Sequence, residues 1–325
     1  MGAEWQEWRA DDRVSDNADQ TEFSAVRFGS CSLDAGTYDD RVAESLDDYE
    51  TADPASAAAW ASRDLTEESA ASDIAIEVRR RMSLLGDAYP FHSDGNQLKY
   101  VRSKTLVYEF CLAVSRSISL TNGDFAKLPR AFERLVRDVL VCFLGKGARG
   151  VRTGWPADGF EDRPIKFKDL VAILHRETGE FRWCPDPGFP DDPAYVKEEG
   201  LDVVVWKEAL DKRPGKLFLV AQCACGNNYT SKYQEIDSDF TKLQRWLKPL
   251  PCVKPIRVFS TPRHIANDVH FWDVNRQAGF TLDRTRIVLM AEEHSDYVCA
   301  EMREPYGSLI RIVIDGFQDD EPALA

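Results

Sequence analysis

The sequence predicts an α/β protein in which helices flank a mixed sheet, with a helical subdomain and an acidic arm in front of it. The first observation behind this fold class is a pair of apolar runs, residues 201 to 206 and 217 to 223, joined by a polar DKRPGK segment. Their length and the intervening Pro-Gly predict a hairpin with a buried face. The second observation is the order of elements around it, which is helix, hairpin, helix, strand, helix, strand and suits a mixed sheet covered by helices.

The formal net charge of −14 is concentrated at the N-terminus. Residues 1 to 73 hold nineteen Asp and Glu against five Arg and no Lys, whereas residues 74 to 314 hold 36 basic and 32 acidic residues. The body of the chain is therefore mildly basic and able to accept a phosphate backbone, while its two ends are acidic.

No run of eighteen apolar residues occurs, and the N-terminus MGAEWQEWRADD lacks the basic and apolar regions of a signal peptide. We therefore expect a cytoplasmic protein that makes no membrane contact. The eight cysteines show no framework spacing, and several lie inside apolar runs, which indicates reduced, buried side chains.

The chain divides into four expected segments: an acidic arm (1 to 63), a helical subdomain (64 to 125), a main domain (126 to 314) and an acidic tail (315 to 325). The arm is rich in Asp, Ala and Ser but carries seven spaced aromatic residues. Its charge favours disorder and its aromatics favour docking, so we expect it to order on its own body or on a protein partner. Within the arm, only residues 23 to 28 alternate as a strand does.

Two helices are expected in the helical subdomain. Residues 65 to 85 have an Asp or Thr cap, acidic residues in the first turn and a terminal Gly. Residues 104 to 118 are apolar nearly all round, which indicates a helix packed on the main body.

In the main domain, residues 128 to 144 predict an amphipathic helix with Pro in its first turn. An insertion follows, with one helix at 167 to 175, and then comes the hairpin. Beyond the hairpin we expect a helix from about residue 229 to 246, a strand at 255 to 260, a helix at 265 to 276 and a strand at 286 to 290.

Polar residues occupy conspicuous places around the hairpin. Asp202 stands at the mouth of the first strand, and an antiparallel return brings Gln222, at the far end of the second, alongside it. Lys232 lies in the first turn of the next helix, where it opposes the helix dipole, so we expect it to face something negative. Glu133 lies on the helix before the sheet, where the simplest interpretation is an exposed pair with Arg137 at i+4.

This arrangement resembles the active site of the PD-(D/E)XK restriction-endonuclease superfamily, in which an Asp is followed by a strand ending in Glu-x-Lys or Gln-x-Lys. Gln222 fits the middle position, but Ala224 stands where the lysine is expected, so Lys232 would be a lysine displaced onto the following helix. A similar subgroup carries the pattern seen here in Gln222, Cys223, Ala224, Gly226, Tyr229 and Lys232. The resemblance covers roughly residues 126 to 292.

The resemblance implies a restriction-endonuclease-like fold and a metal-dependent DNA endonuclease in a restriction or phage-defence setting. Mg²⁺ or Mn²⁺ would be held by hard oxygen ligands. These would be the Asp202 carboxylate, the Gln222 amide oxygen, the Cys223 backbone carbonyl and, from the preceding helix, Glu133. Lys232 would position water or stabilise the pentavalent state.

Other interpretations stay open. Asp202 alone is typical of a turn residue, and Gln222 alone of a satisfied core amide. Gln222 and Ala224 favour a catalytically inactive nuclease-fold protein that binds DNA or acts as a scaffold and recruits a partner through its acidic arm. A third possibility is an arm that mimics DNA and occupies the body's own groove.

Competing motifs are weak: Cys223 and Cys225 are too close for a zinc pair, and HExxH, GxSxG and GxxxxGK[ST] are absent. The choice between DNA and RNA and the formation of a homo-oligomer are left open.

Overall fold

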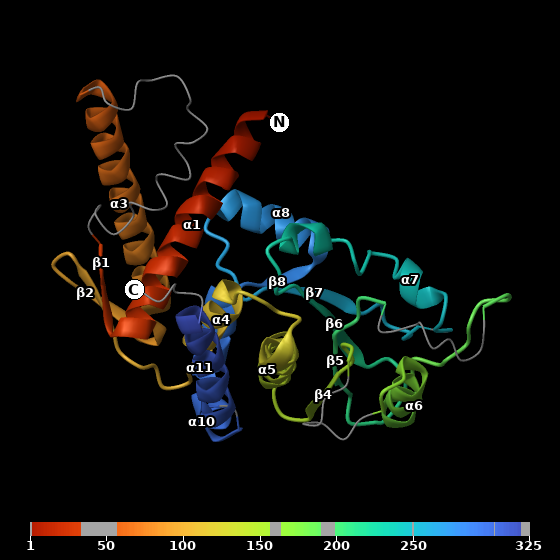
Figure 1. Ribbon diagram of the computed structural model, residues 1–325. Coiled ribbons are helices and arrows are strands. Elements are labelled where there is room, and N and C mark those ends of the chain that lie inside the picture. Colours follow the sequence, from red (N-terminus) through yellow and green to blue (C-terminus); the bar gives the residue numbers. More distant parts are fainter. Residues whose placement is uncertain are drawn as a thin grey trace.

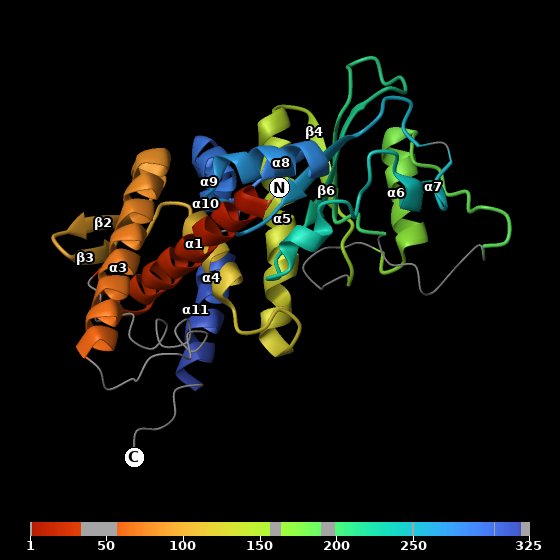
Figure 2. The same cartoon turned by 90° about the horizontal axis from the view of Figure 1, so that it is seen from above.

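The computed structural model of the chain describes residues 2–33, 57–156, 164–189, 199–248, 250–301 and 303–319. Figures 1 and 2 show α1 and α3 at one end of the molecule and the larger sheet at the other, with α5 between them. The predicted α/β class is confirmed, since a mixed five-stranded sheet is flanked by helices.

The larger sheet has the strand order β4-β5-β6-β7-β8. Its strands are β4 (Ala148–Arg152), β5 (Val203–Lys207), β6 (Leu217–Cys223), β7 (Ile256–Ser260) and β8 (Phe280–Leu282). The first three are antiparallel, whereas β7 and β8 run parallel to β6. The carboxyl ends of β6, β7 and β8 therefore meet at one edge of the sheet.

The predicted hairpin is confirmed as β5 and β6, with Val203 opposite Ala221. Alternate residues of these strands enter two separate cores. Val203 and Val205 pack with α5 (Lys127–Leu144), whereas Val204 packs with α6 (Phe167–Thr178). Both faces of the sheet are covered, which explains why these strands are continuous apolar runs.

The segment after β6 differs from the predicted helix. It contains a 3₁₀ turn, η4 (Tyr229–Lys232), and the short helix α7 (Thr241–Gln244). Phe240 has a positive φ of 57°, which a continuous right-handed helix does not contain. The Asp237 side chain accepts bonds from the backbone N–H groups of Asp239 and Thr241, so a local turn replaces helical bonding.

The strand predicted at residues 286 to 290 is wrong, because this run lies within the helix α9 (Arg284–Glu293). Asp283 caps that helix by accepting a bond from the Arg286 backbone N–H at 3.0 Å. The sheet is extended instead by β8. The predicted strand at 255 to 260 and helix at 265 to 276 correspond to β7 and to α8 (Asp268–Ala278).

The helices predicted at 65 to 85 and 104 to 118 are present as α3 (Ala57–Leu85) and α4 (Val107–Arg116). After the short turn η2 (Gly86–Ala88), the chain between these helices forms two strands of a small sheet that the sequence did not predict, and the third strand precedes α3. The order of this sheet is β1-β3-β2, formed by β1 (Ser30–Ser32), β2 (Phe91–Asp94) and β3 (Gln97–Tyr100). The segment expected to be helical therefore also carries strands, and η3 (Gly123–Ala126) leads from it to α5.

The N-terminal segment forms a helix, α1 (Gly2–Phe28), so the strand-like interpretation of residues 23 to 28 is wrong. Ala18, Phe23 and Ala25 of this helix are buried in the same apolar core as α4, α5 and one face of β5 and β6. This part of the expected arm is thus ordered on the body of its own chain. Residues 34 to 56 of the arm lie outside the described part.

The C-terminal helices α10 (Ser295–Glu301) and α11 (Arg303–Asp319) complete the fold. Tyr306 and Val313 of α11 are fully buried, and the helix extends into the segment that we expected to be an acidic tail. Among the described residues, no helix has the length and hydropathy needed to cross a membrane.

Candidate functional site

Asp202 and Gln222 lie opposite each other where β5 begins and β6 ends. The backbone N–H of Asp202 donates to the Ala221 carbonyl at 2.9 Å, and its carbonyl accepts from the Thr153 N–H at 2.7 Å. The Asp202 Oδ2 atom accepts a bond from the Cys223 N–H at 2.7 Å. These contacts fix the carboxylate over the end of β6, where Asp202 and Gln222 are only 6% and 8% exposed.

The amide oxygen of Gln222 is the unusual atom of this site. It is buried and has no hydrogen-bond partner within the part of the chain that the structure describes. A buried polar atom left unpaired costs about 1–3 kcal/mol, so Gln222 does not match the satisfied core amide that its sequence context also allowed. A Cβ atom added at Gly200 would lie 3.1 Å from this oxygen, which shows how closely the backbone passes it.

Glu133 points from α5 toward the sheet and is 7% exposed. Its Oε2 atom lies 2.6 Å from the Arg152 Nε atom at the end of β4, and a side chain at Gly154 would collide with its carboxylate. The Nε atom of Arg137, the residue at i+4, donates to Asp138. Glu133 is therefore a buried residue with an arginine partner that the sequence did not indicate.

Burial raises the pKa of the Cys223 thiol, and the negative charges of Asp202 and Glu133 raise it further. Glu133 contacts Arg152 at the end of β4, and Asp202 contacts the backbone of Cys223 at the end of β6.

Lys232 faces a negative charge, although it ends the 3₁₀ turn η4 and does not lie in the first turn of a helix as the sequence predicted. Its Nζ atom lies 2.7 Å from the Glu235 Oε2 atom, and both side chains are partly exposed. The Glu235 Cγ atom would lie 2.5 Å from a Cβ atom at Gly200, the glycine that also borders the Gln222 oxygen. Lys232 therefore stands at the rim of the site, held by an acid that the sequence analysis missed.

The other nearby lysine is placed differently. Lys216 precedes β6 and its Nζ atom donates to the Arg213 carbonyl at 3.3 Å, at the end of the strand away from Gln222. A strand of seven residues separates the two ends, a span of roughly 20 Å. Lys232 is consequently the better placed of the two basic residues.

Two residues of the site were not found by sequence reasoning. Arg152 lies in a Gly-rich segment with no periodicity, so only the sheet shows that it meets Glu133. Glu235 carried a usable signal, since it follows Lys232 at i+3, a spacing at which opposite charges pair on a helical turn.

The fit of this site to a metal ion is mixed. The described residues contain no group of three or more His, Cys, Asp or Glu side chains placed to hold a metal. The oxygen atoms at hand are those of Asp202, Gln222 and Glu133, and Arg152 already neutralises Glu133. The unpaired Gln222 oxygen beside the Asp202 carboxylate fits a hard cation, which prefers oxygen ligands.

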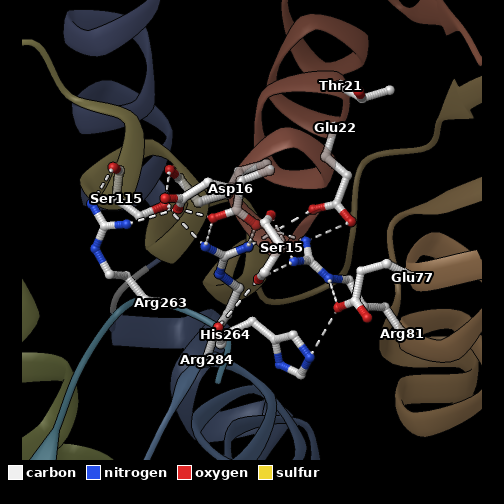
Figure 3. Close-up of polar contacts among 12 residues, drawn as sticks. Ser15, Asp16, Thr21, Glu22, Glu77, Arg81, Ser115, Arg263, His264 and Arg284 are labelled. Atoms are coloured by element: carbon white, nitrogen blue, oxygen red, sulfur yellow. Dashed lines mark hydrogen bonds and ion pairs between the residues drawn. The ribbon is translucent and has the colours of Figure 1, made fainter. Parts of the chain in front are cut away.

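A second polar cluster, buried between α1, α3, α4 and α9, is shown in Figure 3. Asp19 accepts bonds from Arg81 at 2.6 Å and from Arg284 at 2.8 and 2.6 Å, through its Oδ1 and Oδ2 atoms. Glu22 accepts bonds from Arg81, Tyr89 and Tyr108. Burial alone would raise the pKa of Asp19, but Arg284 and Arg81 outweigh it and lower that pKa. Acids of the expected arm therefore hold the fold together.

No family model, no curated protein and no solved structure matches this chain.

Proposed function

We propose that this protein is a metal-dependent nuclease that hydrolyses DNA phosphodiester bonds at the open end of the β5–β6 hairpin. The observation that supports this most is the pairing of Asp202 with Gln222, whose buried amide oxygen has no hydrogen-bond partner among the described residues. These are the two positions that the resemblance to PD-(D/E)XK nucleases assigns to oxygen ligands. The order of elements along the chain, with α5 before the hairpin and the hairpin within a mixed sheet, supports a restriction-endonuclease-like fold. The restriction or phage-defence setting rests on the resemblance alone.

In this proposal Mg²⁺ or Mn²⁺ would be held by Asp202, the Gln222 oxygen, the Cys223 carbonyl and Glu133. The ion would supply Lewis-acid activation of the phosphodiester and of the attacking water. The chain's own contribution is orientation, because the Cys223 N–H fixes the Asp202 carboxylate. Arg152 similarly fixes Glu133, and preorganised groups of this kind stabilise charge that develops in the transition state.

Lys232 provides the positive charge in the same scheme. Glu235 holds its ammonium group at the rim, where it would contact a phosphoryl oxygen of a bound strand. The Lys232 side chain is 41% exposed, so its ammonium can reach a phosphate oxygen of a bound strand, although its departure from Glu235 leaves a buried Oε2 atom.

The test is incubation of the purified protein with plasmid and linear DNA in magnesium, in manganese and in chelator. We expect cleavage only with a metal ion, and its loss in Asp202→Ala. Asp211→Ala is the matched control, because it removes a half-exposed acid from the turn of the same hairpin. Absence of cleavage under every metal condition would contradict the proposed activity, and cleavage in chelator would contradict the metal requirement.

A second candidate is a catalytically inactive nuclease-fold protein that binds DNA or serves as a scaffold. The ion pairs of Glu133 with Arg152 and of Lys232 with Glu235 favour it, since both charged residues are already engaged within the chain. This candidate predicts DNA binding in chelator with no cleavage in any metal. The site does not distinguish DNA from RNA. Parallel reactions with a single-stranded RNA substrate would show which of the two the protein cleaves or binds.

A further inference from the structure

A cavity of about 640 Å³ lies between α1 and the loops that follow β6 and β7. Asn227 and Tyr229 contribute from the first loop, Arg263 from the second, and Arg116 from the end of α4. Because β6 and β7 are parallel, these loops leave the same edge of the sheet, where ligands of open α/β sheets bind. Gln222 is at that same end of β6, so the cavity is a neighbour of the candidate site.

Two arginines of the cavity have unused donors. The Nε atoms of Arg116 and Arg263 are buried and have no hydrogen-bond partner within the described residues. The Arg263 side chain is only 11% exposed. A guanidinium group presents its donors as a fork that matches the oxygens of a phosphate. The cavity is also lined by Asp12, Asp16 and Asp19, so an anion with several acceptor oxygens would bind there against the two guanidinium groups, in competition with these acids.

An acid of the chain already occupies part of this site. The Arg263 Nη1 atom lies 2.9 Å from the Asp16 Oδ1 atom of α1. The Nη2 atom donates to the Asn227 side chain at 2.5 Å. Figure 3 shows the Arg263 side chain close to Ser115 and Asp16. Asp16 is 52% exposed, unlike the fully buried Asp19. An ion pair with an exposed partner contributes little stability, so a phosphate can compete with Asp16 for Arg263.

We propose that Arg116 and Arg263 bind a backbone phosphate of a DNA strand beside the candidate cleavage site, and that Asp16 occupies Arg263 until the strand displaces it. The identity of the ligand as DNA rests on the proposed function, whereas capture of the phosphate requires no cleavage. The acidic face of α1 then acts as an internal competitor for DNA. Displacement needs only a rotation of the exposed Asp16 side chain, because Asp19 keeps the helix in place.

The experiment is fluorescence anisotropy of a labelled DNA duplex with the full-length protein in chelator, across a salt series. Arg263→Gln and Arg116→Gln should each weaken binding, and each should reduce the slope of log affinity against log salt by about 0.9, the value for one phosphate contact. Asp16→Asn should tighten binding several-fold, by an amount on the order of one exposed ion pair. In the Arg263→Gln background, Asp16→Asn should have a smaller effect.

Matched controls remove one charge elsewhere. Arg176→Gln on α6 removes an exposed arginine, and Asp211→Asn removes a half-exposed acid. Thermal unfolding of each variant verifies that it is folded. The proposal would be overturned if the arginine variants bind the duplex with the same affinity as Arg176→Gln. It would also be overturned if Asp16→Asn binds with the same affinity as Asp211→Asn. Absence of duplex binding by both the wild type and Asp16→Asn would also overturn it.

Cleavage by the wild type in magnesium is scored separately, so the two proposals fail independently. Loss of binding in the arginine variants without cleavage in any metal would leave the phosphate site standing and reject the nuclease. Cleavage by the wild type together with unaltered binding by the arginine variants would support the nuclease and reject the phosphate site.

Discussion

Asp19 of α1 and Arg284 of α9 are joined by two bonds of 2.8 and 2.6 Å across 265 positions of the sequence. Both residues are buried, and Arg81 of α3 donates to the same carboxylate. The N-terminal helix is therefore fastened to the body by charge as well as by its apolar residues. Removal of one partner from such a pair leaves an uncompensated buried charge, which is costly.

The first prediction concerns this pair. Asp19→Ala should lower the free energy of unfolding by about 3–5 kcal/mol, the usual cost of breaking a buried ion pair. Urea denaturation measures it. The control is Asp268→Ala, which removes a 95% exposed partner of Arg80 and should change the free energy of unfolding by about 1 kcal/mol or less. Equal effects of the two variants would show that α1 is not fastened in this way.

The second prediction extends the first to the whole helix. Deletion of residues 1–28 exposes the apolar surface of α4 that α1 covers. It also removes Asp19, the partner of Arg284, and leaves Arg81 with Glu77 as its remaining acid. We expect the truncated protein to be insoluble or unfolded, as judged by circular dichroism and gel filtration. A soluble, cooperatively folding truncation would instead restore the interpretation of this segment as a detachable arm.

The third prediction concerns Asp202. Asp202→Asn keeps an oxygen that can accept the Cys223 N–H, so the protein should stay folded while it loses the charged ligand and with it the cleavage of DNA. Plasmid nicking and linearisation in magnesium measure the activity, and thermal unfolding measures the fold. Cleavage at the wild-type rate by this variant would remove Asp202 from the site.

The fourth prediction separates the two lysines. Lys232→Ala should lower the cleavage rate about 100-fold or more, as loss of a charge-stabilising group does. Lys216→Ala should not, because that side chain lies at the far end of β6. The rates are compared under single-turnover conditions with saturating DNA. Similar rates for both variants would show that Lys232 does not act as a displaced catalytic lysine.

The fifth prediction is a pH dependence set by His264. Burial would lower the pKa of this imidazole, but its hydrogen bonds with Asp283 and Glu77 outweigh burial and raise the pKa above its ordinary value of 6.5. Its ring also meets Arg80 and the Thr285 hydroxyl. A pKa raised by folding contributes stability that is fully present below pH 6.5 and is lost as the pH rises through the folded value.

The pKa values of the acids around His264 are shifted in the opposite direction. The pKa of Glu77 is lowered to about 2 and that of Asp283 is also lowered, in each case because hydrogen bonds and charge outweigh burial. Their contribution is present above the unfolded pKa and lost on acidification. Urea denaturation on both sides of pH 6.5 should therefore show stability falling with rising pH, and less so in His264→Gln. Parallel pH profiles of the two proteins would contradict the assignment.

Part of the candidate site follows from the sequence. The hairpin is encoded by local apolar runs and its turn, and once β5 and β6 pair, Asp202 and Gln222 must stand opposite each other. The helix of Glu133 was equally predictable from its 3.6-residue periodicity. Lys232 does meet an acid, but the helix whose dipole was the reason for expecting one is not formed, because Lys232 ends a short 3₁₀ turn.

Other features were decided by tertiary structure alone. The run at 286 to 290 suits a strand or a helix by composition, and the Asp283 cap together with burial of Ile287 and Val288 makes it helical. Arg152 became the partner of Glu133 only through the pairing of β4 with β5. The acids of α1 were indistinguishable in sequence from those of a solvated arm. Their role depends on arginines more than sixty residues away, and local patterns carry no information about such distant partners because only packing of the whole chain brings them within bonding distance.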